Sequence, residues 1–337
     1  MMDENALRER IAEQMRGFMP ACVIGAAAEL DLWAAISAEG DSLDTLAQKM
    51  RCDQRGLAIL LDALAAIGLL HKDKDEKYSV PPAVRTLMTD ETDESDATML
   101  PMVRHWMSVL RAWSQLAWAV RGGLPAPRTP SIRGAIADRD AFIAGMHSLG
   151  RSLAPPLVER LGTLKFKHLL DVGGASGTWT FAFLQAVDGA RATIFDLPDA
   201  IAQARERVEK EGMADRVDLA PGDFYQDPLP GGVDFAWVSA IIHQHGREEN
   251  RALFAKVFDA LEPGGRIAIR DIVMDENRTA PVEGAMFAIN MLSCTETGGT
   301  FTFIELSEDL NAAGFENSEF LIKDEGMCSI VVAVKPV

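Results

Sequence analysis

Apolar and polar residues follow two different periods along the chain, and the change of period divides it. Up to about residue 161, apolar residues recur at three- and four-residue steps, as in Ile24, Ala27, Ala28 and Leu32, which is the spacing of one helix face. From Lys167 onward, short apolar runs alternate with amphipathic segments. This alternation predicts a parallel sheet covered on both faces, preceded by a mainly helical part.

The beginning of the chain is predicted to form two helices followed by a hairpin. After a helical pattern over residues 3–38, Ser42 is placed to cap a short helix at 43–50, and a second helix at 55–67 ends at Gly68. Two apolar pieces, 69–71 and 77–80, flank a charged turn and predict the hairpin. This order of elements is that of a winged helix.

A winged helix raises the alternative of a DNA-binding regulator. Lys49, Arg51 and Arg55 lie near its second helix. They are surrounded by acidic residues: Asp41, Asp44, Asp53, Asp62, Asp73, Asp75 and Glu76. Because such a surface neutralises phosphates poorly, the pattern favours a dimerisation or partner-binding module.

The middle of the chain is predicted to be helical. An acidic loop at 90–96 precedes a helix with an apolar face, a loop follows at 122–130, and a further helix covers 140–161. The apolar face of the first of these helices consists of Met99, Met102, Trp106, Val109, Trp113 and Leu116. Most of these side chains are expected in the core, and two or three are expected to face a flat hydrophobic substrate. The domains are therefore predicted at 1–95, 96–165 and 166–337.

The last part is predicted to be a Rossmann-like sheet of seven strands. The strands are expected at 168–172, 191–196, 215–220, 233–239, 265–271, 317–323 and 327–335, and the helices at 177–187, 198–211, 247–261, 282–293 and 303–313. Only three residues separate the last two strands, so they must form an antiparallel hairpin. The last strand therefore runs against the others.

A cluster of small residues ends the first of these strands, at 169–177. Asp171 is followed by Gly173, Gly174 and Gly177, which allow a tight turn into a helix and a close approach of the backbone to a ligand. Asp196 ends the next strand, 25 residues after Asp171 (196 minus 171), where a carboxylate accepts ribose hydroxyls. Such a turn alone is a weak signal, and together these features indicate a nucleotide-like ligand.

Two further strand ends carry side chains suited to chemistry. Asp223 and Phe224 follow the third strand, where a carboxylate can bind an adenine amine while the ring packs on the base, although Gly-Asp is commonly only a turn. His243 follows the fourth strand and can act as a base. Asp271 ends the fifth strand and can orient that imidazole, or else pair with Arg266 or Arg270.

Taken together, these segments resemble the S-adenosylmethionine-dependent small-molecule O-methyltransferases of the plant and hydroxyindole type, which include bacterial members. Residues 171–177 are similar to the family's Asp-Val-Gly-Gly-Gly-x-Gly motif, and 195–198 match its Phe-Asp-Leu-Pro. Residues 222–224 and 261–265 are similar to its Gly-Asp-Met/Phe and Leu-x-Pro-Gly-Gly elements. The N-terminal winged helix looks like the family's dimerisation domain, so the resemblance covers nearly the whole chain.

The resemblance implies an O-methyltransferase acting on a flat, apolar, hydroxylated acceptor, with His243 as general base and Asp271 orienting it. Residues expected to hold S-adenosylmethionine, and its product S-adenosylhomocysteine, are Asp171, Gly173, Gly174, Gly177, Asp196, Leu197, Asp223, Phe224, Ser239 and His245. Residues expected to face the acceptor are Trp106, Phe142, Met146, Asn290 and Met291. The protein is expected to need no metal ion and to bind no membrane. It is expected to form a homodimer through the N-terminal domain.

The sequence departs from the family pattern in three places. His245 replaces a Trp that usually stacks on adenine. The family has a second Glu just after a Gly-Gly pair, whereas here Thr300 and Phe301 follow the pair and the nearest Glu is Glu296. Ala175 replaces a glycine, which is tolerable if its φ is negative. These differences leave open that the chain methylates carbon or nitrogen, or binds the cofactor without methylating.

Charge and composition narrow the remaining alternatives. The formal charge of −17 disfavours nucleic acid and anionic membranes. The four scattered cysteines indicate free thiols without a zinc site, and the polar start predicts a cytoplasmic protein. A nicotinamide-dependent oxidoreductase is disfavoured because residues 173–177 lack the spacing of the dinucleotide fingerprint.

Overall fold

The computed structural model describes residues 3–89, 98–162 and 165–337, so the predicted acidic loop at 90–96 lies outside it. The chain forms two compact units. The first comprises Met1–Arg111 and Arg128–Ser148, and the second comprises Ala112–Pro127 and Leu149–Val337. The division of the chain into three domains, with boundaries after residues 95 and 165, stays a prediction.

The first unit is mainly helical. Its helices are α1 (Glu4–Arg16), α2 (Phe18–Glu29), α3 (Leu32–Ala35), α4 (Leu43–Met50), α5 (Gln54–Ala66), α6 (Pro82–Met88), all but the last two residues of α7 (Leu100–Trp113) and the first half of α9 (Ala135–Arg160). The predicted cap of α4 is confirmed, because the Ser42 hydroxyl accepts the Thr45 N–H at 3.3 Å. Gly68 takes a left-handed φ of 79° where α5 ends, as predicted.

The predicted hairpin of the first unit is present, with one strand more than expected. β2 (His71–Lys72) pairs antiparallel with β3 (Lys77–Ser79), and β1 (Asp41–Ser42) pairs with the other edge of β3. A strand of two residues shows no period in the sequence, which is why β1 was missed. Trp33, Leu61 and Tyr78 are fully buried between these elements and make the core of the unit.

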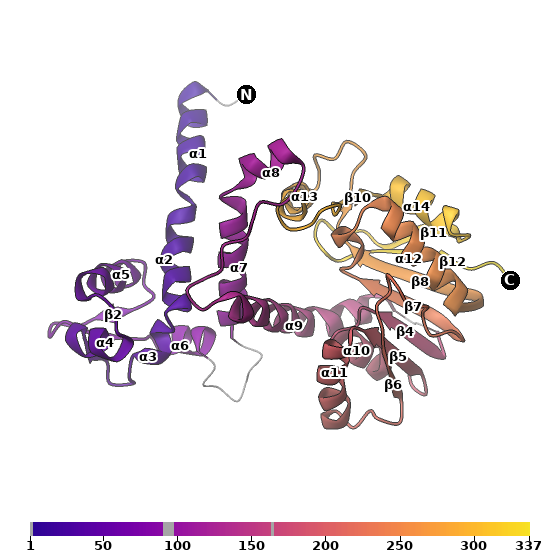
Figure 1. The fold of residues 1–337 in the computed structure, drawn as a ribbon, viewed down its shortest axis with the longest axis horizontal. Coiled ribbons are helices and arrows are strands. Elements are labelled where there is room, and N and C mark those ends of the chain that lie inside the picture. Colours follow the sequence, from indigo (N-terminus) through magenta and orange to yellow (C-terminus); the bar gives the residue numbers. More distant parts are fainter. Residues whose placement is uncertain (1–2, 90–97, 163–164) are drawn as a thin grey trace. The chain divides into compact units, whose positions relative to one another are not determined.

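The second unit is built around a seven-stranded sheet (Figure 1). Its strands are β4 (His168–Val172), β5 (Arg191–Asp196), β6 (Val217–Pro221), β7 (Val233–Ser239), β8 (Leu261–Asp271), β11 (Glu316–Ile322) and β12 (Ser329–Val334). They lie in the order β11-β12-β8-β7-β4-β5-β6. The β12 strand is antiparallel to both of its neighbours, which confirms the predicted direction of the last strand.

The remaining elements of this unit connect and cover the strands. They are α8 (Leu116–Gly122), α10 (Thr178–Ala186), α11 (Pro198–Lys210), the 3₁₀ helix η1 (Ile242–Gln244), α12 (Arg247–Ala260), α13 (Val282–Cys294), α14 (Phe303–Ala312), β9 (Val273–Met274) and β10 (Phe301–Thr302). The parallel pair β9–β10 was not predicted. The predicted strand at 265–271 begins four residues later than β8, because the Pro-Gly-Gly segment before it continues the strand through a register shift opposite β7.

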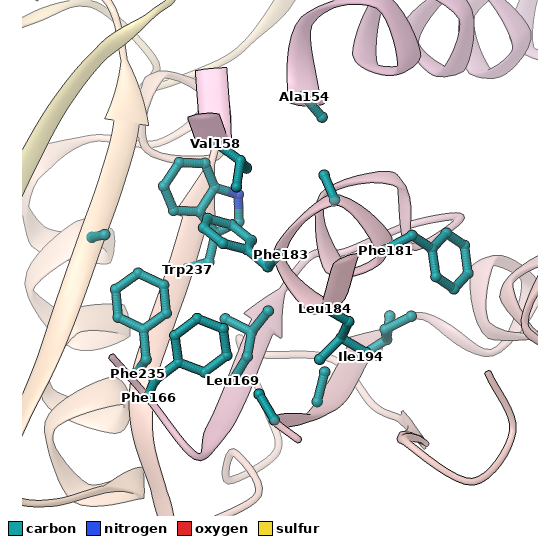
Figure 2. Packing of buried hydrophobic residues seen from close by; sticks show 14 of the residues in the cluster. Ala154, Val158, Phe166, Leu169, Phe181, Phe183, Leu184, Ile194, Phe235 and Trp237 are labelled. Atoms are coloured by element: carbon teal, nitrogen blue, oxygen red, sulfur yellow. The ribbon is translucent and has the colours of Figure 1, made fainter. Parts of the chain in front are cut away.

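Apolar side chains cover both faces of the sheet. On one face the rings of Phe166, Phe183, Phe235 and Trp237 pack together, with Phe183 and Trp237 edge to face at 4.9 Å between ring centroids (Figure 2). On the other face Val172, Val238 and Ile269 join a second buried cluster. Because both faces are closed, the polar residues that follow the strands are confined to the sheet's edge.

The cysteines and the apolar helices bear on two further expectations from the sequence. All four cysteines are free and half-buried, as predicted. In the described parts of the chain, no helix combines the length and apolar character needed to cross a bilayer.

Candidate active site

The structure brings twelve of the predicted site residues to the carboxyl-terminal edge of the sheet in the second unit. They lie at or just after the ends of β4, β5, β6, β7 and β8: Asp171, Gly173, Gly174, Gly177, Asp196, Leu197, Asp223, Phe224, Ser239, His243, His245 and Asp271. In open α/β sheets this edge forms the ligand crevice.

The turn after β4 leaves no room for side chains. Gly173 and Gly177 take left-handed φ values of 66° and 78°, and a Cβ on Gly174 would lie 2.7 Å from the Asp171 carboxyl carbon. The condition under which Ala175 would be tolerated without strain, a negative φ, is not met: its φ is 45°. A left-handed alanine costs about 1 kcal/mol, so the turn holds a strained residue at its tip.

Asp171 is buried beneath this turn. Its side chain is 1% exposed and accepts a hydrogen bond from the Thr180 hydroxyl at 2.7 Å. Burial raises the pKa of Asp171 to about 7, and the nearby charge of Asp196 adds to the increase. The carboxyl group therefore holds the turn against α10 and is not available as an exposed ligand.

Asp196 at the end of β5 reaches back to the turn. Its carboxylate accepts the N–H groups of Ala175 and Leu197, both at 2.7 Å. Burial raises the pKa of Asp196, and these two bonds oppose the increase. Ala175, the strained residue of the turn, is thus hydrogen-bonded to Asp196, which was predicted from the sequence to bind the ribose.

Asp223 and Phe224 form the next part of the edge. The Asp223 carboxylate accepts the Tyr225 N–H at 2.9 Å and the Gln226 amide at 3.1 Å, as expected of a turn acid. Phe224 packs on the second buried cluster and lies 4.9 Å from the Tyr225 ring. A carboxylate oxygen can accept more than one hydrogen bond, so these turn contacts are compatible with an adenine amine on the same carboxylate.

A histidine and a tyrosine stand beside Phe224. The buried His245 ring lies 5.0 Å from the Tyr225 ring, nearly perpendicular to it, and its Nδ1 is hydrogen-bonded to the Tyr225 hydroxyl. Burial lowers the pKa of His245, so the imidazole is mainly neutral at pH 7. Sequence reasoning missed Tyr225, because nothing in its spacing indicates this contact.

His243 and Asp271 are in direct contact. The Nδ1 of His243, on η1, lies 3.0 and 2.9 Å from the two Asp271 carboxylate oxygens, and both side chains are buried. Asp271 pairs with neither Arg266 nor Arg270 among the described ion pairs. Since a carboxylate on Nδ1 favours a proton there, Nε2 keeps the lone pair that a general base needs.

The backbone around His243 is held from two sides. Gly299 donates its N–H to the His243 carbonyl at 2.9 Å, and Asn250 donates its side-chain amide to the Ile242 carbonyl at 3.0 Å. The Phe287 ring meets the imidazole edge to face at 4.9 Å. Neither Asn250 nor Phe287 was singled out from the sequence, because neither lies in a recognisable motif.

The predicted acceptor residues are divided between the units. Asn290 and Met291 lie on α13 in the second unit, where Trp113 donates its indole N–H to the Asn290 side-chain oxygen at 3.1 Å. Trp106, Phe142 and Met146 lie in the first unit and are exposed there. Their role beside the acceptor therefore stays a prediction.

The residues at this edge fit a nucleoside cofactor. The glycine turn packs closely on Asp171, Ile194 and Ile241, which only residues without a Cβ allow, and acidic residues follow the next two strands. Among residues 3–89, 98–162 and 165–337, no three His, Cys, Asp or Glu side chains gather in a way that would hold a metal ion.

Comparison with protein families shows what this architecture is similar to. Residues 134–316 match the O-methyltransferase domain, and residues 12–90 match the O-methyltransferase dimerisation domain.

Individual proteins are similar over most of their length. The chain is 28% identical to 3-hydroxy-5-methyl-1-naphthoate 3-O-methyltransferase of Streptomyces sahachiroi (86% of this chain, 84% of the relative). It is 29% identical to the tetracenomycin polyketide synthesis 8-O-methyl transferase TcmO of Streptomyces glaucescens (86% of each). The solved structure of PigF with SAH matches with a TM-score of 0.82 at 25% identity, covering 97% of this chain and 99% of PigF.

Proposed function

The chain belongs to the S-adenosylmethionine-dependent O-methyltransferases, and from this premise we propose that it methylates a hydroxyl of a flat, apolar, aromatic or polyketide-like molecule. The naphthoate and tetracenomycin enzymes to which it is similar support this acceptor class. The observation that carries the proposal is the buried contact of His243 with Asp271 at the same edge as the glycine turn.

S-adenosylmethionine, when bound, supplies a methyl group on a positively charged sulfur and leaves as S-adenosylhomocysteine. The turn at 173–177 and the carboxylate of Asp196 would hold its nucleoside part. Asp223 and Phe224 would receive the adenine, with His245 standing where the family has a Trp. Leu197, whose side chain is exposed, would lie against the ribose.

His243 would accept the proton of the acceptor hydroxyl through Nε2. Asp271 holds the ring by Nδ1 and stabilises the imidazolium that forms. A phenol with a pKa near 10 needs only modest help from an imidazole, so one orienting acid suffices. Proton removal by His243 requires no metal ion, and we expect methyl transfer to persist in the presence of a chelator.

Methyl transfer tests this assignment. We would incubate the protein and a panel of naphthols and hydroxynaphthoates with methyl-labelled cofactor and compare wild type with His243→Ala. The expected loss in kcat is about 10²–10⁴-fold, the usual contribution of a general base. His71→Ala, which removes an exposed histidine from the first unit, is the control and should keep full activity.

The results separate the alternatives. Label recovered on oxygen and lost in the His243 variant supports the proposal. Label on carbon or nitrogen would assign a different acceptor atom, and transfer unaffected by His243→Ala would remove this residue from the chemistry.

We further propose that the chain forms a homodimer through its first unit, which carries the dimerisation domain. Leu7, Ile11 and Met15 lie four residues apart on one face of α1 and are 46%, 52% and 69% exposed, and α1 has no buried residue. An apolar face of this kind is typical of a helix that packs on a partner. Light scattering at micromolar concentration should give twice the 36.7 kDa chain mass, and a monomer would contradict the proposal.

A further inference from the structure

Arg270 is an arginine buried at the ligand edge of the sheet. It precedes Asp271 at the end of β8, and its residue is only 7% exposed. Successive strand residues point to opposite faces, so Arg270 lies on the face away from the His243–Asp271 contact. Its guanidinium lies 4.7 Å from the ring centroid of Trp179, in the first turn of α10.

The partners of this guanidinium are neutral. Its Nε donates to the Ser239 hydroxyl at 2.7 Å, and its Nη1 donates to the Met327 carbonyl at 2.9 Å. Among the ion pairs of the described residues, none includes Arg270. Burial lowers the pKa of Arg270, and the charge of Asp271 and the neighbouring Cys328 oppose this shift.

A buried cation without a paired anion is costly, and such a charge is normally paired, hydrogen-bonded or used to bind a ligand. Two features indicate an anion at this place. Ser239 is only half-buried at the carboxyl end of β7, and because its oxygen accepts from Arg270, its own hydroxyl proton remains to be donated outward. The nine-residue helix α10, which begins beside it after the glycine turn, adds the positive end of its dipole.

We propose that Arg270 and Ser239 form the site for the α-carboxylate of the cofactor's methionine end, where the guanidinium supplies the charge and the serine hydroxyl the direct hydrogen bond. This inference rests on the proposed function, because it requires the cofactor to lie across the same edge. A carboxylate on the acceptor has the same chemistry, and the experiment below distinguishes the two sources.

Calorimetric binding of two ligands tests the proposal. S-adenosylhomocysteine carries the carboxylate, and its decarboxylated analogue, S-adenosyl-3-thiopropylamine, differs only in lacking it. Wild type should bind the first about 10- to 100-fold more tightly than the second, the usual value of a hydrogen bond to a charged group. Arg270→Gln should reduce this preference to roughly 3-fold or less by weakening only S-adenosylhomocysteine. Arg266→Gln, an exposed arginine on the same strand, is the control and should keep the wild-type preference.

Other outcomes would overturn the proposal. Equal weakening of both ligands by Arg270→Gln would mean that Arg270 only supports the fold of the edge, and an unchanged preference would mean that the carboxylate binds elsewhere. Should circular dichroism show Arg270→Gln to be unfolded, Ser239→Ala decides: a reduced preference supports the site, and a full preference refutes it. Wild type binding neither ligand would refute the proposed cofactor itself.

The acceptor arm uses 3-hydroxy-1-naphthoate and 2-naphthol. If Arg270→Gln raises KM for the naphthoate alone and leaves the preference for S-adenosylhomocysteine intact, the carboxylate recognised is the acceptor's and the cofactor assignment is wrong. Equal KM values for wild type and variant with both acceptors, together with the lost cofactor preference, support the site as proposed.

Discussion

The buried carboxyl group of Asp171 makes a quantitative prediction about stability and pH. Its pKa is raised from 3.8 to about 7 in the folded protein, chiefly by burial. A carboxyl whose folded pKa is raised binds its proton more tightly in the folded state. Its contribution is therefore fully present below the unfolded pKa and is lost as pH rises through the folded pKa. The stabilisation by Asp171 is thus lost over the pH range from about 4 to about 7.

The substitution Asp171→Asn removes this titration and keeps the shape of the side chain. Proton linkage with the two pKa values above lowers the free energy of unfolding of the wild type by about 2 kcal/mol when the pH rises from about 5.5 to about 8. The variant lacks that loss, so its stability relative to wild type should improve by about 2 kcal/mol over the same interval. Any change in the hydrogen bond to Thr180 adds equally at both pH values and cancels.

Urea unfolding at the two pH values, followed by circular dichroism, measures the difference. Asp218→Asn, which removes a carboxylate that is 57% exposed at the surface of β6, should show nearly the same change in stability at both pH values. If Asp171→Asn shifts stability equally at both, Asp171 titrates normally and the reasoning about its burial is refuted.

Four further substitutions test the turn and the acceptor side. Ala175→Gly relieves a left-handed alanine and should leave the unfolding free energy unchanged or raise it by up to about 1 kcal/mol in urea titrations, and a clear loss would contradict the strain. Gly177→Ala, whose Cβ would lie 2.7 Å from a neighbouring methyl, should instead lower it by about 1–3 kcal/mol. Arg207→Met removes two hydrogen bonds to Ser176 in the glycine turn and one to Thr178 at the start of α10, and it should weaken S-adenosylhomocysteine about 3- to 10-fold by calorimetry, so an unchanged Kd would show that the turn needs no such support. Trp113→Phe removes the donor that fixes the Asn290 amide and should raise the acceptor KM while leaving that Kd unchanged, and a change confined to the Kd would argue against an acceptor role.

The sheet was predictable because the sequence indicates each of these strands by an apolar run and by the residue type at its end. β4, β5 and β7 have the predicted bounds, since each is a mainly apolar run: β5 ends at Asp196, β7 ends at Ser239, and β4 ends directly before Gly173. The contact of His243 with Asp271 follows from the same logic, because residues after neighbouring parallel strands meet at one edge. The chemical role of that contact remains a prediction.

What the sequence did not reveal depends on tertiary packing. The positive φ of Ala175 accompanies the bond of its N–H to Asp196, a residue 21 positions later, and no local propensity shows it. Arg270 reads as an ordinary strand-end arginine until the burial of its side chain is known. The pairing of Tyr225 with His245 joins two loops twenty residues apart, and neither loop carries a signal for it.

The most direct test of the central claim is a crystal structure of the protein with S-adenosylhomocysteine and a phenolic acceptor that still carries its hydroxyl. We expect the acceptor hydroxyl to donate to Nε2 of His243 at an oxygen-to-nitrogen distance of about 3 Å, on the side facing the cofactor's sulfur. An ordered acceptor whose oxygen contacts another side chain and lies out of reach of His243 would contradict it.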